Sequence, residues 1–78
     1  MTKRGNRTAY GIPFIWDNHC WCTVPSETMQ KVRITPSKME GGAWAVFDAR
    51  GEMHELIGED VEKRAFAIAV AFAEQKEH

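Results

Sequence analysis

The sequence predicts an α+β domain: a four- to five-stranded antiparallel sheet with one long C-terminal helix packed on one face. Short apolar segments, separated by Gly, Pro, Asp or Asn, occupy much of residues 12–57 and are typical of strands. The connections between them are too short for the helical crossover that a parallel pair needs, so the strands should be antiparallel. Residues 61–78 contain no Gly or Pro and are rich in Ala, which favours a helix.

The first predicted hairpin follows a basic segment. Residues 1–8 (MTKRGNRT) are expected to form a flexible basic tail. The strands predicted at 12–16 (IPFIW) and 19–24 (HCWCTV) are separated by Asp17 and Asn18. Both residues tolerate the positive φ of a tight hairpin turn, so the two strands should pair.

The middle of the chain predicts two further strands. A single helical turn is expected at 25–29, with Ser26 as its N-cap. Residues 30–35 (QKVRIT) alternate, which predicts a strand with one buried side and one basic, exposed side. A turn is expected at 36–42 (PSKMEGG). Residues 43–48 (AWAVFD) are apolar on both sides, as in a central strand covered on both faces.

A second hairpin leads into the helix. Residues 49–52 (ARGE) predict its loop, with Gly51 in the left-handed conformation, and residues 53–57 (MHELI) predict the returning strand. Asp60 is expected to cap the helix. The helix has an apolar arc wider than one sheet face requires. The stripe expected to cover the sheet comprises Val61, Ala65, Ile68, Ala69 and Phe72.

The flank of this helix is also apolar, because Phe66, Val70 and Ala73 lie beside the sheet-covering stripe. Apolar patches of this size rarely stay bare. Either the N-terminal hairpin folds over the flank, or another chain does. The second alternative makes these three residues a candidate interface of a homodimer.

Size and charge exclude several classes of protein. The chain has 78 residues, which is enough for one small domain. Its net charge of -1 gives no general attraction to nucleic acid or anionic lipid. Residues 1–50 hold seven Lys/Arg against four Asp/Glu, and residues 51–78 hold three against seven. No apolar run is long enough for a membrane helix, and the N-terminus does not resemble a secretory signal. We therefore expect no membrane association and a place in the cytoplasm of a bacterial or infected host cell.

The tetrapeptide HCWC (19–22) contains the only two cysteines of the chain. In a strand, Cys20 and Cys22 share one side, and His19 and Trp21 share the other. Structural zinc needs four ligands, and no second Cys/His pair follows. A disulfide across so short a ring would be strained. The sequence favours buried thiols facing the core, and leaves reactive thiols, a zinc half-site and a disulfide as alternatives.

Three tryptophans are many for so small a core. Trp16 and Trp21 flank the first predicted turn, where they can pair across the strands and anchor a protein partner. His19 would lie on the same side as Trp21. The basic side chains Lys31 and Arg33 would steer the approach of a partner, or of phosphates together with the N-terminal tail.

No catalytic motif appears in the sequence. His54 lies close to Asp48, Glu52 and Glu55, but there is no matching nucleophile, phosphate loop or pair of inward carboxylates. We therefore predict no enzymatic activity, no metal site and no cofactor. Glu52 and Glu55 are instead candidate binding residues, in an acidic patch that could meet a basic surface.

The segment VRITPSKMEGGAWAVFDARGEMHELIGEDVEKRAFAIAVAFAEQ (32–75) resembles the small β-hairpin-plus-helix proteins of phages and mobile elements, including some anti-CRISPR proteins. It is also similar to short bacterial domains of unknown function with a "GWAV"-type strand before a helix. The first resemblance implies a stoichiometric inhibitor that blocks a larger protein or nucleoprotein complex. The alternatives are a nucleic-acid-binding or regulatory module that uses the basic tail and residues 30–35, and a homodimeric interaction protein.

Overall fold

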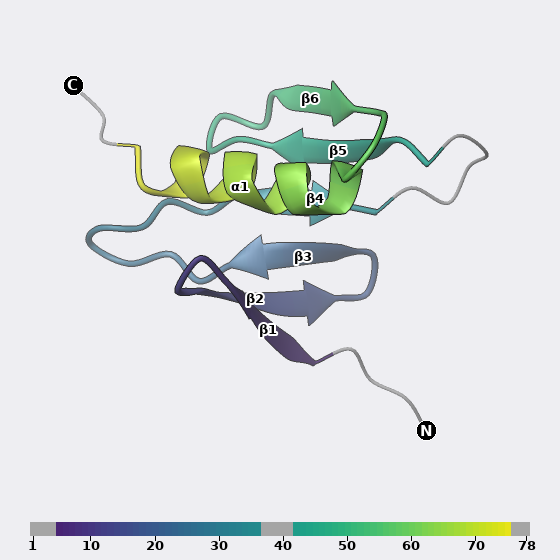
Figure 1. The fold of residues 1–78 in the computed structure, drawn as a ribbon. Coiled ribbons are helices and arrows are strands. Elements are labelled where there is room, and N and C mark those ends of the chain that lie inside the picture. The colour runs from purple at the N-terminus through teal and green to yellow at the C-terminus, as the bar shows by residue number, and fades with distance from the viewer. Residues whose placement is uncertain (1–4, 37–41, 76–78) are drawn as a thin grey trace.

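The fold is a six-stranded antiparallel sheet followed by one helix, in a computed structural model that describes residues 5–36 and 42–75 (Figure 1). This confirms the α+β class, with more strands than the sequence predicts. Each strand pairs with the next along the chain, so the sheet is a meander. The elements are β1 (Asn6–Ala9), β2 (Ile12–Asp17), β3 (Cys20–Thr23), β4 (Arg33–Thr35), β5 (Trp44–Phe47), β6 (Met53–Leu56) and α1 (Val61–Ala73).

The additional strand is β1, which takes up residues 6–8 of the expected tail. Tyr10 and Gly11 join it to β2, with φ angles of 54° and 78°. Two residues with positive φ form the turn that matches the twist of paired strands. Residues 1–4 lie outside the described residues. The NRTA strand has no apolar alternation, which is why the sequence pattern does not reveal it.

The β2–β3 hairpin predicted from residues 12–24 is confirmed, and its register fixes the side on which each aromatic residue lies. Trp16 pairs directly with Trp21, and their ring centroids lie 5.1 Å apart. Directly paired residues share one face of a sheet. Phe14 lies two residues before Trp16 and therefore shares that face. Phe14 is fully buried, so this is the core face.

The connection from β3 to β4 contains no helical turn, contrary to the expectation for residues 25–29. Ser26 and Met29 instead exchange backbone hydrogen bonds. Thr23 stands at the start of this connection and is buried. Its hydroxyl donates to the Gln30 carbonyl at 2.8 Å and accepts from the Val32 N–H at 2.9 Å. One side chain thus satisfies two backbone groups that the short strand β4 leaves unpaired.

The last hairpin, β5–β6, is confirmed, and Gly51 has the expected positive φ of 89°. The structure corrects one feature of this region: β5 is covered on one face only. Val46 is fully buried beneath the helix, whereas Ala45 and Phe47 on the other side are partly exposed. The predicted turn at 36–42 lies largely outside the described residues.

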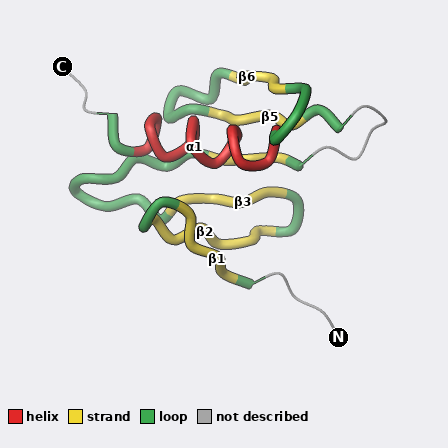
Figure 2. The backbone as a smooth tube through the Cα atoms, in the orientation of Figure 1, coloured by secondary structure: helices red, strands yellow, loops and turns green. Residues whose placement is uncertain are grey.

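Helix α1 packs across one face of the sheet, closest to β5 and β4 (Figures 1 and 2). Asp60 precedes it in a left-handed conformation without a side-chain cap, so the expected capping hydrogen bond does not form. Of the residues expected to extend the helix, 74 and 75 are non-helical, and 76–78 lie outside the described part of the chain.

The sheet curves so that its first two strands reach the flank of the helix. The ring of Phe66 meets Phe14 edge-on, with centroids 4.9 Å apart. Phe66, Val70 and Ala73 are all buried within this chain. Internal cover by the N-terminal hairpin is therefore the alternative that holds. The prediction that these three residues form an oligomer interface is wrong, because their side chains are already buried in the single chain.

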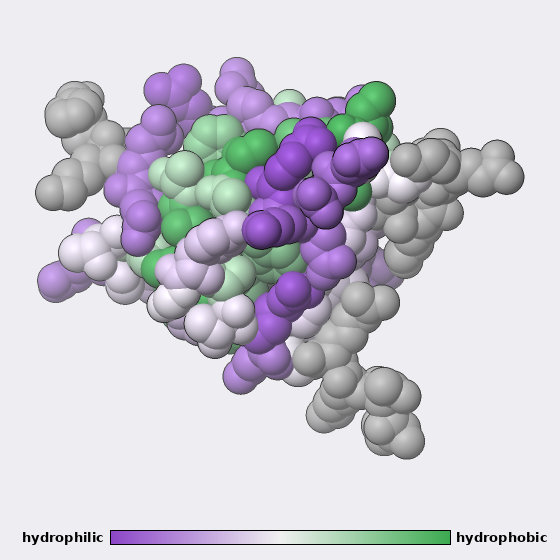
Figure 3. Space-filling model, viewed as in Figure 1, coloured by the Kyte–Doolittle hydropathy of each residue, from purple (hydrophilic) through white to green (hydrophobic). Residues whose placement is uncertain are grey.

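Figure 3 views the molecule from the helix side. Hydrophilic residues gather over the N-terminal part of α1, and more apolar residues lie beside them towards its C-terminal part. Among the described residues, no helix is both long and apolar enough to cross a lipid bilayer.

Candidate functional site

The face of the sheet opposite the helix, here called the open face, has no element packed over it in the described part of the chain. Strand pairing aligns one residue from each strand in a single row across this face. We call this the central row. It consists of Asn6, Ile15, Cys22, Arg33, Phe47 and Met53.

Most of the central row is apolar. Ile15 is 42% exposed and Met53 is 60% exposed, while Phe47 is half-buried. An antiparallel sheet with one wet face normally alternates between apolar inward and polar outward residues. Here the central-row positions of β2, β3, β5 and β6 depart from that rule, whereas Asp17 and Glu55 on the same face follow it. The open face is therefore a stronger candidate for binding than an ordinary solvated sheet.

Arg33 is the charged residue of the row and lies near its middle, while the polar Asn6 lies at one end. Its guanidinium carbon lies 5.9 Å from the centroid of the Phe47 ring, within range of a cation–π contact. The side chain is exposed, and no carboxylate in the described ranges lies within 4 Å of it. Arg33 thus presents a cation without an ion pair among the described residues, next to Phe47 and to the hollow that Asp17 also lines. Arginine in such a setting binds carboxylates well, because its planar fork can make two hydrogen bonds at once.

A shallow hollow of about 360 Å³ adjoins Arg33 at the β2–β3 turn. Its walls include His19, Cys20, Thr35 and Phe47. His19 is exposed, so the structure brings together two of the predicted binding residues, His19 and Arg33. The expected common side for His19 and Trp21 does not form, because His19 belongs to the turn rather than to β3.

Trp21 is not part of this surface. It is 4% exposed and packs in the core near Phe66, with ring centroids 6.3 Å apart. The prediction that Trp21 anchors a partner is therefore wrong: pairing with Trp16 turns it towards the helix. Trp16 lies on the same side and is half-buried against the core. The two tryptophans close one end of the core, and neither faces the open side of the sheet.

The cysteines consequently take the opposite side from the one expected. Cys20 and Cys22 lie on the open face, with their sulfur atoms 3.5 Å apart. Both are free thiols. Burial, followed by the hydrogen bond with Cys20, raises the pKa of Cys22 to about 11. Cys22 is thus a protonated thiol at neutral pH, and Cys20 is the more accessible of the two.

Two other predicted binding residues lie on the side of the open face. Lys31 is exposed two positions before Arg33, and Glu55 is exposed two positions after Met53, opposite Ala45 of β5. Glu52 is exposed at the β5–β6 hairpin end, apart from the central row. The predicted acidic patch therefore does not form one surface, since Glu52 and Glu55 lie on opposite sides of the hairpin.

A second hollow, of about 600 Å³, lies on the helix side between the β1–β2 hairpin and the start of α1. Arg7 lines it and donates a hydrogen bond to Glu62 at 2.8 Å. The Arg7 guanidinium also lies 4.2 Å from the centroid of Phe66. Arg7 is therefore engaged within the fold, which removes one basic residue from the expected phosphate-binding set.

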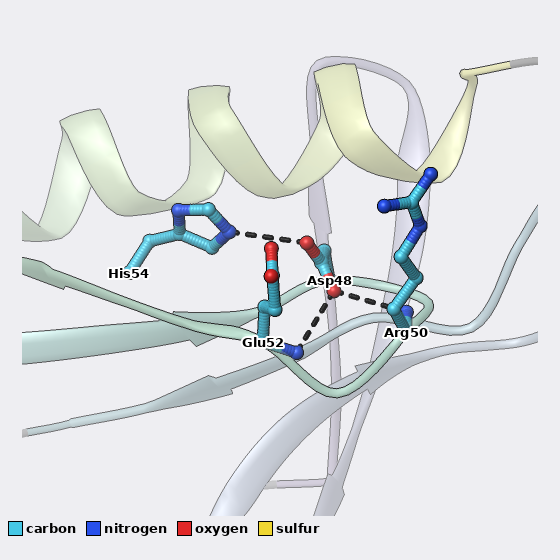
Figure 4. Close-up of polar contacts among 4 residues, drawn as sticks. All are labelled: Asp48, Arg50, Glu52 and His54. Atoms are coloured by element: carbon cyan, nitrogen blue, oxygen red, sulfur yellow. Dashed lines mark hydrogen bonds and ion pairs between the residues drawn. The ribbon is translucent and has the colours of Figure 1, made fainter.

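A polar cluster lies at the end of the β5–β6 hairpin (Figure 4). One oxygen of Asp48 accepts the backbone N–H groups of Arg50 and Glu52, at 2.9 and 3.0 Å. The other oxygen lies 3.1 Å from Nε2 of His54. The hydrogen bond with His54 is the largest cause that lowers the pKa of Asp48 below its usual value. The His54–Asp48 proximity expected from the sequence is confirmed.

No family model, curated protein or solved structure matches the chain significantly. The surface residues that the sequence analysis missed are Ile15, Phe47 and Met53 of the central row. Their signal was present in the outward positions of each predicted strand, but a residue facing outward cannot be recognised until the buried face is known.

Proposed function

We propose that this chain is a small non-enzymatic binding protein that attaches to a larger protein or nucleoprotein complex through its open face. The observation that carries the proposal is the central row, in which Ile15 and Met53 are exposed and Arg33, without an ion pair among the described residues, lies between Cys22 and Phe47. Arginine, methionine and aromatic residues are enriched in protein interfaces. The resemblance to phage-encoded inhibitors supports a stoichiometric blocking role, in which occupation of the partner's surface is itself the activity.

The chemistry of the row defines the partner surface. Burial of Ile15, Phe47 and Met53 supplies the apolar contribution to binding. Arg33 would lose water on binding, so the partner must place a carboxylate opposite it. The matching surface is therefore an apolar protein patch that contains at least one Asp or Glu.

A panel of single substitutions tests this proposal. The tagged chain is used to capture its partner from a lysate of the native host, and the captured protein is identified by mass spectrometry. We expect R33E and M53E to lose that partner. K63E is the matched control, because Lys63 is exposed on the helix and undergoes the same reversal of charge as Arg33. Equal capture by all four proteins would refute binding through the open face.

Nucleic-acid binding is the competing function and has a separate readout. Lys31 and Arg33 are both exposed. Both lie in the segment 30–35, whose exposed side the sequence predicts to be basic. Binding dominated by phosphates weakens steeply as salt rises, because counterions are released. Titration of a DNA or RNA oligonucleotide at two salt concentrations distinguishes the two functions. Strong, salt-sensitive binding that R33E abolishes would favour nucleic acid over an acidic protein surface.

A further inference from the structure

We propose that the end of the β5–β6 hairpin binds one Zn²⁺ ion through Asp48, Glu52 and His54. This inference is independent of the proposed function, because the three residues lie away from the open face. Their ligand atoms (one imidazole nitrogen and two carboxylate oxygens) all lie within 4.8 Å of one another. Imidazole nitrogen and carboxylate oxygen are both established ligands of zinc.

The hairpin places the three side chains on one side. Asp48 and Glu52 stand opposite each other, since the Asp48 N–H donates to the Glu52 carbonyl at 3.0 Å. His54 follows Glu52 by two positions and therefore points to the same side of its strand. Figure 4 shows the side chains of the three residues gathered at this end of the hairpin. The arrangement follows from strand register and does not depend on a long flexible loop.

The spacing of two of these ligands suits a shared ion. Nε2 of His54 and Oδ2 of Asp48 are 3.1 Å apart. Two atoms that each lie about 2.0–2.1 Å from a tetrahedral zinc ion are about 3.3 Å apart. The two atoms are therefore spaced as two ligands of one Zn²⁺ ion, and each side chain needs only to turn so that its lone pair points to the ion instead of to the other residue. The exposed carboxylate of Glu52 needs a rotation to close the third position, and water would fill the fourth.

The surrounding contacts hold two ligands in place. Oδ1 of Asp48 accepts hydrogen bonds from the N–H groups of Arg50 and Glu52, which fix the carboxylate. Oδ2 is left for the ion. The ring of His54 packs against Phe72 of the helix, with centroids 4.8 Å apart. Such supporting contacts orient metal ligands and strengthen binding.

The charge of the cluster points the same way. The carboxylates of Asp48 and Glu52 lie close together, and His54 and two backbone N–H groups already stabilise the charge of Asp48. Neither Asp48 nor Glu52 makes an ion pair with Lys or Arg in the ranges that the structure describes. A divalent cation could accept both carboxylates as ligands. The imidazole ligand favours zinc over Mg²⁺ or Ca²⁺, which prefer oxygen alone.

Calorimetric titration of the full chain with ZnCl₂ tests the site. We expect one ion per chain and at least tenfold weaker binding in E52Q, which loses a ligand on an exposed side chain and should fold normally. D48N retains an acceptor for the two N–H groups and should weaken binding similarly. E55Q is the matched control, because it alters a carboxylate on the other side of the same strand, and its affinity should be unchanged.

Three results would overturn the proposal. The first is the absence of zinc binding to the wild-type chain, and the second is equal affinities for E52Q and E55Q. The third is loss of the ion in C20S, which would place it at the thiols of the open face instead. The ring protons of His54 provide an independent readout by NMR, and we expect their signals to shift in step with added zinc.

Discussion

Truncation of Phe66 to Ala should be among the most damaging single changes in this protein. Phe66 is 2% exposed and contacts Phe14 edge-on, with Trp21 and Trp44 at centroid distances of 6.3 Å. Removing a buried phenylalanine typically costs about 3–5 kcal/mol, because both burial and packing are lost. A 78-residue domain has a total stability of about 4–12 kcal/mol. F66A should therefore lose a large fraction of its stability.

The matched control is F47A, which deletes the same side chain from the open face. Phe47 is half-buried and has no helix above it, so its truncation should cost about 1 kcal/mol. Urea unfolding followed by circular dichroism measures both variants against the parent protein. We expect the midpoint of F66A to fall well below that of F47A, with similar slopes. Equal losses would refute the assignment of one covered and one open face.

Three other results follow from particular contacts. T23V should lower stability by about 1–3 kcal/mol in urea unfolding because two buried backbone groups lose their partner, and T23S should restore most of it. A thiol reagent at neutral pH should modify Cys20 first, since the pKa of Cys22 is raised to about 11; equal rates for the two thiols would contradict the structure. Because His54 lowers the pKa of Asp48 from 3.8, this carboxylate stabilises the fold above about that pH and ceases to do so as the pH falls further. In a metal-free buffer, the acid unfolding of D48N should accordingly depend less on pH between about 5 and 2 than that of the parent.

The parts of the fold that the sequence predicts are those with a strong local pattern. The Ala-rich helix, the Gly51 hairpin and the pairing of Trp16 with Trp21 are all confirmed. Strand β1 was missed because its residues carry no apolar alternation, and only its pairing with β2 makes it a strand.

The orientation of β3 illustrates why a surface is harder to predict than a fold. Because side chains alternate with a period of two, an error of one position exchanges the two faces of a strand. Cys20, Cys22 and Trp21 each have a side chain that can be buried, so their sequence leaves both orientations open. The packing of Trp21 near Phe66 of the helix decides between them, and that contact joins residues far apart in the sequence. The expected binding role therefore moves from Trp21 to the residues of the central row.

The measurement that tests the open face most directly is solvent relaxation enhancement by NMR, with a soluble gadolinium complex added to the protein. The signals of the Ile15 and Met53 methyl groups should broaden strongly, because both side chains are exposed. Those of Ile34 and Val46 should remain sharp beneath the helix. Strong broadening of Ile34 and Val46 together with protection of Ile15 and Met53 would show that the helix covers the opposite face, and would contradict the account.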